Sequence, residues 1–315
     1  MHKTGDDMSK LKKVVIGLVI LLIAIPLCGF GYLYFKLNSM YDKTEAQNVE
    51  KIESVEESEV TEGITNILLA GVDGNNLDRG NRSDAMMILT LDSNNNDIRL
   101  TSLARDTYVD IEGHGTEKLT HAYAYGGPSL LLKTIKNNFG ISIDKYAVVS
   151  FESFQKIIDG IGGVEISLTD PEVSQINGIN SSGSQTLSGA QALEYSRIRY
   201  IDSAYARDNR QRTVIESAYN KLVSSSSSKL LNMVNTLFAY TKTNMTPMEI
   251  IGLATNAIKI NDKDFDQLEF PLEGHRTGHI ISNQKGWVIE WEKDYNLNVL
   301  SKFIYNYNEY KTQYE

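Results

Sequence analysis

Half of the chain's arginines fall within one short stretch. The sequence contains ten arginines, and five of them lie in residues 194–212, "EYSRIRYIDSAYARDNRQR". The formal net charge of the chain is −9, so this local excess of one cation needs an explanation. Arginine presents a planar fork that forms two parallel hydrogen bonds to a carboxylate or phosphate, which lysine cannot do. The stretch therefore predicts a site for an anion.

The spacing of these residues indicates that two chain segments contribute to such a site. Arg197 and Arg199 are two positions apart, so an extended segment would point both side chains the same way. Arg207, Arg210 and Gln211 share one face of the helix predicted next, and the N-terminus of a helix also favours an anion. Converging guanidinium groups repel one another unless a multivalent anion neutralises them. A diphosphate is such an anion.

A structural role for the same arginines is the alternative. Ion pairs with neighbouring carboxylates would also explain the spacing, and the carboxylates in range are those of Asp202, Asp208 and Glu194. Arg212 lies on another face of the helix, where we expect it to pair with Glu216 four residues later.

Two aspartates flank the loop between the first two predicted strands. Asp73 closes one strand and Asp84 opens the next, so both carboxylates are expected at one edge of the sheet, where α/β proteins place ligands. Two carboxylates, with water and phosphate oxygens, are a usual way to hold Mg²⁺. Arg82 lies in the same loop. A turn rich in Gly, Asn and Asp without any ligand is the alternative.

Arg105 and Lys118 are weaker candidates when each is taken alone. Arg105 follows the third predicted strand in "SLARD", close to the expected position of the first loop. A surface pair between Arg105 and Asp106 would explain this motif equally well, and a lone lysine such as Lys118 is usually solvated. No serine-hydrolase elbow, HExxH motif, P-loop or GxGxxG fingerprint occurs in the sequence.

Strands that alternate with helices are predicted to position these residues. The apolar segments expected as strands are 65–73, 84–92, 97–106, 145–151, 164–169, 267–271 and 287–291. The expected helices are 127–138, 151–163, 187–197, 205–223, 229–241, 247–259 and 294–307. This alternation predicts an α/β fold, a three-layer α/β/α domain around a mixed sheet that extends over residues 64–315.

The N-terminal residues predict one transmembrane helix. Residues 14–35 form 22 consecutive positions without a formal charge, long enough to cross a hydrocarbon core of about 30 Å. Lysines precede this segment and Tyr32, Tyr34 and Phe35 end it, which places residues 1–13 in the cytoplasm and the domain outside the cell membrane. A cleaved signal peptide is the alternative, but "FKLNSM" is a poor cleavage site.

The remaining composition narrows the class of protein. Residues 36–63 are rich in Glu, Ser and Thr, so we expect an acidic linker that buries little and holds the domain off the membrane. The acidic balance, with a pI near 5.2, argues against a nucleic-acid partner. The single cysteine, Cys28, excludes an intramolecular disulfide.

Seven ordered segments resemble the LytR–CpsA–Psr family of bacterial cell-wall enzymes. They are "NILLAGVD", "RSDAMMILTLD", "LTSLARDTYV", "KLTHAYAYGG", "VVSFESFQKIIDGIGGVEI", "LSGAQALEYSRIRY" and "ARDNRQRTVI". The resemblance implies an anchored, extracytoplasmic enzyme that transfers a polyprenyl-diphosphate-linked glycopolymer, such as teichoic acid or capsular polysaccharide, onto peptidoglycan. It also implies an apolar channel for the polyprenyl tail, which helices near 151–158 and 187–196 would line.

The resemblance assigns roles to individual residues. Asp73 and Asp84 match the family's aspartates for Mg²⁺ (or Mn²⁺). The residues expected to bind the diphosphate are Arg82, Arg105, Lys118, Arg197, Arg199, Arg207 and Gln211, together with Arg210 from the helical spacing. Asp84, Arg105 and Arg199 are the expected catalytic residues. A non-catalytic receptor for polyprenyl diphosphates that regulates wall synthesis is the alternative function.

One position departs from the family pattern. The family has an aspartate three residues before Arg207, where this chain has Ala204. Because the resemblance implies that this aspartate orients arginines of the site, Asp202 or Asp208 is expected to take its place.

Overall fold

A computed structural model describes residues 31–32, 34–53, 61–74, 77, 79–199, 201–202, 204–225, 240–260, 262, 264–282 and 285–314. The strands of its central sheet are β1 (Ile64–Val72), β2 (Ser83–Asp92), β3 (Asp97–Leu103), β6 (Lys145–Ser150), β9 (Lys242–Thr243) and β10 (Asp266–Phe270). Their order across the sheet is β10–β3–β2–β1–β6–β9. β1 is parallel to β6 and β10 to β3, and the other neighbours are antiparallel, which confirms the mixed sheet.

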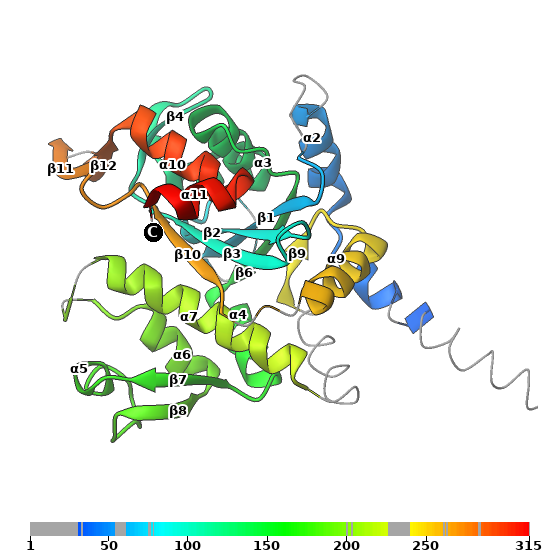
Figure 1. Cartoon of the computed structure of the whole chain (residues 1–315), viewed down its shortest axis with the longest axis vertical. Helices are drawn as coiled ribbons and strands as arrows, with labels where there is room; N and C mark the ends of the chain where they lie inside the picture. The colour runs from blue at the N-terminus through cyan, green and yellow to red at the C-terminus, as the bar shows by residue number, and fades with distance from the viewer. Residues whose placement is uncertain are drawn as a thin grey trace, which may run out of the picture.

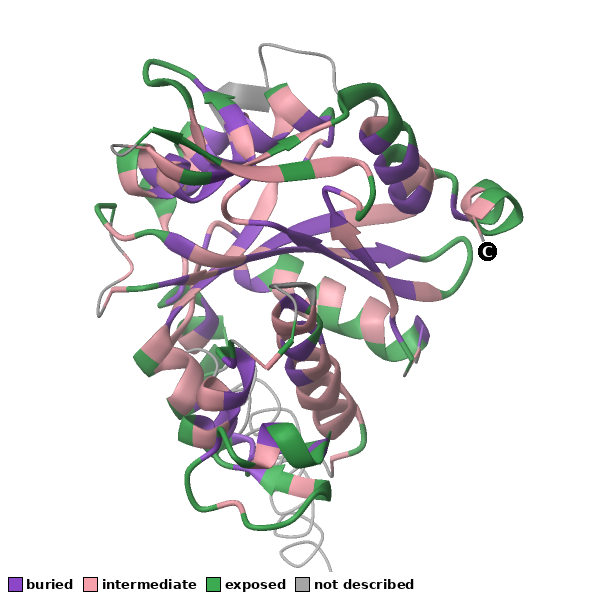
Figure 2. Ribbon diagram, turned by 90° about the vertical axis from the view of Figure 1, so that its left-hand side faces the viewer, coloured by how far each residue is buried: buried purple, intermediate pink, exposed green. Residues whose placement is uncertain are grey.

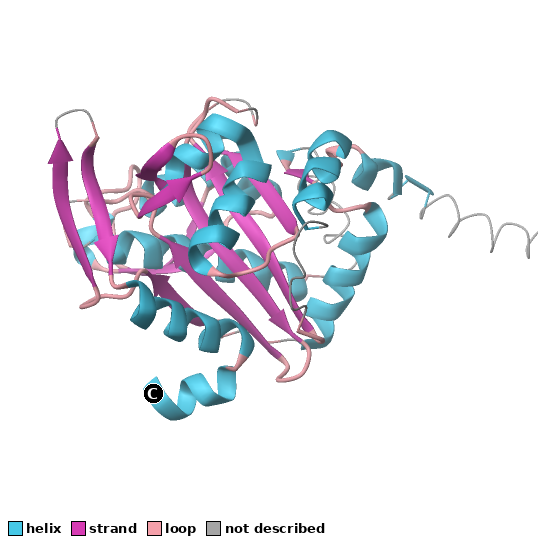
Figure 3. Cartoon of the chain, turned by 90° about the horizontal axis from the view of Figure 1, so that it is seen from above, coloured by secondary structure: helices cyan, strands magenta, loops and turns pink. Residues whose placement is uncertain are grey.

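Helices cover both faces of this sheet (Figures 1 and 3). The helices are α2 (Lys43–Glu53), α3 (Leu119–Phe139), α4 (Phe151–Gly160), α5 (Asp170–Val173), α6 (Gly189–Ser196), α7 (Ala204–Val223), α9 (Pro247–Ile260), α10 (Lys293–Tyr305) and α11 (Tyr307–Tyr314). One face packs against α2, α3, α10 and α11, and the other against α7 and α9. The strands are the most deeply buried elements (Figure 2) because both of their faces are covered.

Three two-stranded hairpins complete the fold, and most of their strands were not predicted. The strands are β4 (Tyr108–Ile111) with β5 (Gly115–Lys118), β7 (Val164–Leu168) with β8 (Gly183–Leu187), and β11 (Arg276–Ser282) with β12 (Gly286–Trp291). β5 and β8, "GTEK" and "GSQTL", lack the apolar alternation that marks a strand in a sequence. Beneath β7–β8, α4 and α6 pack over a separate apolar cluster.

The helix predicted at 127–138 is present, as the second part of a helix that is longer than predicted. The sequence placed it near 127 because Pro128 suits a first helical turn, but α3 begins at Leu119. Gly127 has a φ of 67° inside the helix, so the Gly–Pro pair marks a kink. Thr107 and Arg105 accept the first backbone hydrogen bonds of α3, from Leu119 and Thr120. The kinked helix therefore starts beside the end of β3.

The prediction that residues 36–63 bury little is wrong for the first half of this segment. Residues 34–38 are helical and α2 follows. Leu37, Met40 and Val49 are all buried, and Val49 contacts the main core. A few apolar side chains on one side of an otherwise polar helix are sufficient for docking, which average composition does not detect.

Two predicted segments lie largely outside the described residues. The expected span at 14–35 falls mostly within residues 1–30, and the expected helix at 229–241 within 226–239. In the part of the chain that the structure does describe, no helix is both long and apolar enough to cross a membrane.

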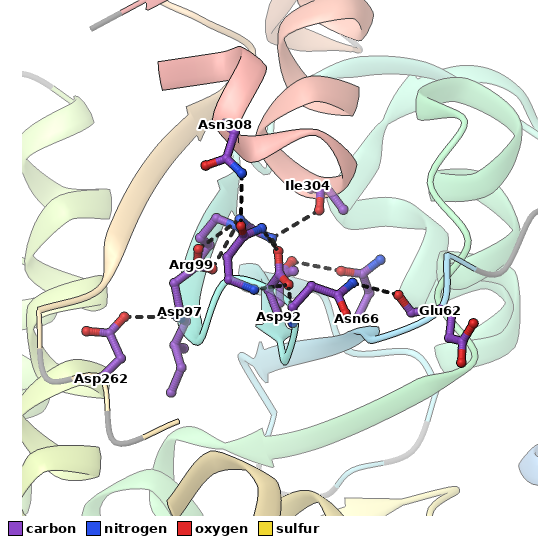
Figure 4. A network of polar contacts seen from close by, with 12 residues as sticks. Glu62, Asn66, Asp92, Asp97, Arg99, Asp262, Ile304 and Asn308 are labelled. Carbon is purple, nitrogen blue, oxygen red and sulfur yellow. Dashed lines mark hydrogen bonds and ion pairs between the residues drawn. The ribbon is translucent and has the colours of Figure 1, made fainter. Parts of the chain in front are cut away.

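A buried ionic network holds the C-terminal helices to one end of the sheet (Figure 4). The Arg99 guanidinium is fully buried, 2.7 Å from Oδ2 of Asp92 and 3.1 Å from Oδ1 of Asp97. It also donates to the carbonyl of Ile304 at 3.2 Å and lies 4.4 Å from the ring centroid of Tyr307. Burial raises the pKa of Asp97 to about 6, despite the opposing charge of Arg99. The network thus joins the β2–β3 turn to α10 and α11.

Candidate functional site

The sheet topology places the candidate residues at the edge of the sheet opposite to the one that holds the Arg99 network. β1 and β6 are parallel, as are β3 and β10, so all four C-terminal ends lie at this edge, and the antiparallel β2 begins there. Asp73 directly follows β1, Asp84 is the second residue of β2, and Arg105 lies two residues after β3. The sequence prediction that these side chains share one edge is therefore confirmed.

Arg105 and Asp84 form the centre of the site. Nη1 of Arg105 lies 2.6 Å from Oδ1 of Asp84, and both side chains are about three-quarters buried. Asp106 lies between Arg105 and Lys118, 3.5 Å from Nε of the first and 3.4 Å from Nζ of the second. Burial alone would lower the pKa of Arg105, but the carboxylates of Asp84 and Asp106 outweigh it and raise the pKa. The guanidinium therefore stays charged.

Asp73 positions the loop that carries Arg82. Oδ1 of Asp73 accepts a hydrogen bond from the Arg82 backbone N–H at 2.7 Å, and the Asp73 N–H donates to the Arg82 carbonyl at 3.0 Å. Farther along the loop, the Tyr123 hydroxyl of α3 donates to the carbonyl of Leu77. The Arg82 side chain is exposed at the rim of the site.

Arg197 and Arg199 follow α6 and face solvent. A capping box between Ser188 and Gln191 begins this helix, and Arg197 ends it. The Arg197 guanidinium lies 5.0 Å from the ring centroid of Phe151, the residue that follows β6 at the same sheet edge. Neither Arg197 nor Arg199 has an ion pair with any residue that the structure describes. Both are therefore available to an anionic ligand.

Arg207 and Gln211 lie on α7, which contacts the end of α6. The Arg207 guanidinium donates to Oδ1 of Asp208 at 2.8 and 3.0 Å. Asp208, one of the two carboxylates expected to orient the arginines, therefore holds Arg207. Gln211 donates to the carbonyl of Ser196 at 3.5 Å, one residue before Arg197, which ties α7 to the end of α6.

Arg210 lies instead between two carboxylates away from these groups. Its Nε donates to Glu172 at 2.6 Å, its other nitrogens contact Asp202, and its side chain is 4% exposed. The alternative of structural ion pairing thus describes the contacts of Arg210. Glu194, the third carboxylate considered, accepts hydrogen bonds from Asn177.

The expected pair between Arg212 and Glu216 does not form. Arg212 donates to Gln267 and to Ser102, both at 2.8 Å, and so fastens α7 to β10 and β3. Glu216 accepts from the backbone of Phe265 at 3.1 Å. Helical spacing puts the two side chains within reach, but the neighbouring strands provide better-placed partners.

Replacing Arg210 by methionine is expected to lower the free energy of unfolding by about 3 kcal/mol, because it leaves the buried Glu172 carboxylate without its counter-ion. Urea denaturation measures this change, and the double variant with Glu172→Gln should recover part of it. If Arg210→Met keeps full stability but loses affinity for the diphosphate, Arg210 is a ligand of the site after all.

Glu269 introduces a pH dependence beside the site. This residue is the last but one of β10 and lies opposite Ser102, 3.1 Å from Arg276, and burial raises its pKa from 4.5 to about 7. The folded state therefore keeps a proton that the unfolded chain has lost, and stability falls as the pH rises through this window.

Relative to Glu269→Gln, the wild-type chain is expected to lose up to about 3 kcal/mol of unfolding free energy as the pH rises from about 4.5 to about 7. Urea denaturation of both proteins at several pH values measures the difference, in which the titration of other groups cancels. Parallel pH profiles would show that Glu269 ionises normally.

The donor chemistry of Asp73 and Asp84 fits Mg²⁺, which prefers carboxylate oxygens. In the described ranges, no group of three or more His, Cys, Asp or Glu side chains is close enough to enclose a metal. Mg²⁺ is usually held by only one or two carboxylates, with water and phosphate oxygens as the other ligands. Asp73 and Asp84 each accept a hydrogen bond at Oδ1, and oxygen is the donor that this ion prefers.

One contributor to the site, Phe151, was not singled out from the sequence, and Asp106 was named there only together with Arg105. Asp106 links Arg105 to Lys118, and its signal was its position next to Arg105 in "SLARD". Phe151 supports Arg197, but only the parallel pairing of β1 with β6 shows that it ends at the same edge. An aromatic residue at a strand–helix junction carries no such signal by itself.

Fold and site together define the class of protein, an α/β domain whose sheet edge carries an arginine-rich, aspartate-lined site. Residues 29–296 match the model of the LytR_cpsA_psr family. The chain therefore belongs to the LytR_cpsA_psr family, which confirms the resemblance drawn from its seven sequence segments.

Curated relatives share most of the chain. A polyisoprenyl-teichoic acid–peptidoglycan teichoic acid transferase TagU from Oceanobacillus iheyensis is 30% identical over 298 residues, which cover 82% of this chain and 92% of the relative. A protein of the same name from Enterococcus faecalis is 36% identical over 229 residues, which cover 69% of this chain and 74% of the relative.

Solved structures share the fold. TagT bound to LI-WTA is similar with a TM-score of 0.65 and 26% identity, over 78% of this chain and 90% of that one. The family protein YwtF (TagT) with bound octaprenyl pyrophosphate lipid has a TM-score of 0.61 and 25% identity, over 80% of this chain and 93% of that one.

Proposed function

We propose that this chain is a membrane-anchored phosphotransferase that moves a polyprenyl-diphosphate-linked anionic glycopolymer onto peptidoglycan. The names of its TagU relatives and the octaprenyl pyrophosphate bound to YwtF support this donor and acceptor. Within this chain, the observation that carries the proposal is the partly buried Arg105–Asp84 pair, at the same sheet edge as exposed arginines from separate segments.

The arginines hold and polarise the diphosphate. Arg105 is held by Asp84 and Asp106, so the position of its charged guanidinium is set before the substrate binds. Arg197 and Arg199, which are exposed, would close on the phosphate oxygens from the end of α6. Preorganised charges of this kind stabilise the oxygens on which negative charge develops in the transition state.

Asp73 and Asp84 would hold Mg²⁺ together with the diphosphate. A bound Mg²⁺ supplies positive charge at the phosphate oxygens and helps to orient them. Asp84 would then contact both the ion and Arg105, from which its Oδ1 already accepts a hydrogen bond. Lys118, linked to Arg105 through Asp106, extends the positive charge towards the rim.

The transfer exchanges the phosphoanhydride bond of the donor for a phosphodiester bond to the acceptor. A hydroxyl group of the acceptor sugar attacks the phosphorus that carries the glycopolymer, the bridging P–O bond breaks, and polyprenyl phosphate leaves with the bridging oxygen. The apolar cluster beneath α4 and α6 lies next to the end of α6, where Arg197 is located. We assign the prenyl tail of the donor to this cluster. Residues 14–35 would anchor the chain with its domain outside the cytoplasm.

The test is release of polyprenyl phosphate from a lipid-linked glycopolymer donor by the full-length chain, with and without Mg²⁺. Wild-type chain should release it only with the ion, and Arg199→Ala and Asp84→Ala should release much less. Lys133→Ala, which removes a cation from a partly exposed ion pair on α3, is the matched control. Equal release by all four proteins would refute the assignment, and donor binding without metal-dependent release would favour a non-catalytic receptor.

A further inference from the structure

The solvent-facing side of α9 has an unusual composition for a surface helix. With about 100° between successive residues, the outward positions that are also exposed are Met248, Gly252, Ala254, Thr255, Ile258 and Lys259. We call this set the α9 outer face. It contains one charged residue, Lys259, and the side chains of Met248 and Ile258 are 57% and 56% exposed. The outer side of a surface helix is ordinarily charged and polar.

The opposite side of α9 is fully accounted for by the fold. Leu253, Ala257 and Ile260 pack against the sheet. The apolar residues of the α9 outer face are therefore additional to those that hold the helix in place. An exposed apolar patch that folding does not require marks an interaction surface.

The N-terminal segment attaches directly to this helix. Leu37 and Met40 pack against Ile250 and Ile251 of α9. The backbone N–H of Thr243 donates to the carbonyl of Met40 at 2.9 Å, which fastens the same segment to β9, just before α9. Figures 1 and 3 show α9 beside this segment. The end of the expected membrane span is thus held against α9.

The residues at the end of that span resemble a membrane interface. Tyr32, Tyr34 and Phe35 are 51%, 45% and 74% exposed, and Lys36 follows. Aromatic rings next to lysine are typical of the headgroup level of a bilayer. From Phe35 to Met40 the chain can advance only about 8 Å as a helix. If Phe35 lies at the interface, α9 lies close to it as well.

We propose that the α9 outer face lies in the headgroup region of the bilayer that anchors the chain. This inference rests on the anchoring part of the proposed function. The mainly apolar outer face suits shallow insertion, and the charges of Lys36 and of Lys259 at the end of this face suit anionic headgroups. The domain then contacts the membrane at two places, the anchor and α9, in contrast to the expectation of a linker that holds it away.

Lipid quenching tests this contact in the full-length chain. On a Cys28→Ser background, Met248→Cys and Ile258→Cys are labelled with an environment-sensitive fluorophore and reconstituted in vesicles of phosphatidylethanolamine and phosphatidylglycerol. Both labels should shift to shorter emission wavelengths and lose emission when nitroxide lipids are added. Labels at Glu112→Cys and Thr186→Cys, which are exposed on β4–β5 and β8, should do neither.

The outcomes separate this inference from the enzymatic proposal. Labels at 248 and 258 that remain unquenched in vesicle-bound chain overturn it, whatever the donor turnover. A blue shift without lipid quenching also overturns it, because a second copy or another protein then covers the face. Failure of the chain to float with vesicles overturns both the anchor and this contact. Quenched labels without donor turnover support the contact and contradict only the enzymatic proposal.

The double variant Met248→Glu/Ile258→Glu provides a functional readout. It should cleave donor in detergent at the wild-type rate, since neither residue belongs to the catalytic or diphosphate-binding set. In vesicles it should turn over donor more slowly, because two carboxylates disfavour the headgroup contact. Equal rates for variant and wild type in vesicles would contradict a role for the α9 outer face in orienting the domain.

Discussion

Arg105→Ala is expected to lower the turnover number for the lipid-linked donor about 100- to 1,000-fold, the usual cost of removing one preorganised charge from a transition state. Arg105 is the most firmly held cation of the site, because Asp84 and Asp106 both contact it. Its partly buried position reduces screening by water, so its charge acts strongly on the diphosphate.

The loss should fall mainly on kcat, because the charge that Arg105 stabilises develops during the reaction. Arg105→Lys should recover only a small part of the rate. The planar guanidinium can contact Asp84 and a phosphate at the same time, whereas the ammonium group of lysine is a point charge without this fixed geometry. Lys133→Ala, remote from the site on α3, should retain wild-type kinetics. A wild-type kcat for Arg105→Ala would exclude Arg105 from the chemistry.

Arg99→Met is expected to cost about 3–5 kcal/mol of unfolding free energy, a large fraction of the stability of an ordinary domain. The substitution keeps much of the apolar volume but leaves the buried Asp92 without its counter-ion. It also removes the hydrogen bond to Ile304 and the contact with the Tyr307 ring. Attachment of α10 and α11 to the sheet should weaken first.

Trp291 fluorescence during urea denaturation measures this effect. The indole packs 5.5 Å from Phe139 and 5.3 Å from Phe270 (ring centroids), so it reports on the core of the domain. Lys133→Ala should cost less than about 1 kcal/mol, as for other surface pairs. Adding Asp92→Asn to Arg99→Met should restore part of the stability. An unchanged denaturation midpoint for Arg99→Met would show that the network contributes no net stability.

Local pattern was sufficient for the long elements of this fold. The apolar runs that became β1, β2, β3 and β6 were recognisable because strands covered on both faces need continuous apolar sequence. The predicted start of α6 and the predicted end of α3 were also close to the observed ones, since helix caps such as Ser188 and Gly140 depend only on nearby residues. The polar hairpin strands and α2 were missed because their stability comes from packing against distant parts of the chain.

By itself, the sequence determined that Asp73, Asp84 and Arg105 lie at one sheet edge, since strand ends joined by short connections must meet there. It also placed Arg197 and Arg207 close together along the chain. Only the tertiary structure decided that Arg210 donates to Glu172 and that Arg212 donates to Ser102 and Gln267. Helical spacing defines the face of the helix on which a side chain lies. The partner group opposite that face comes from residues far away in the sequence, and the packing of whole helices and strands determines which group that is.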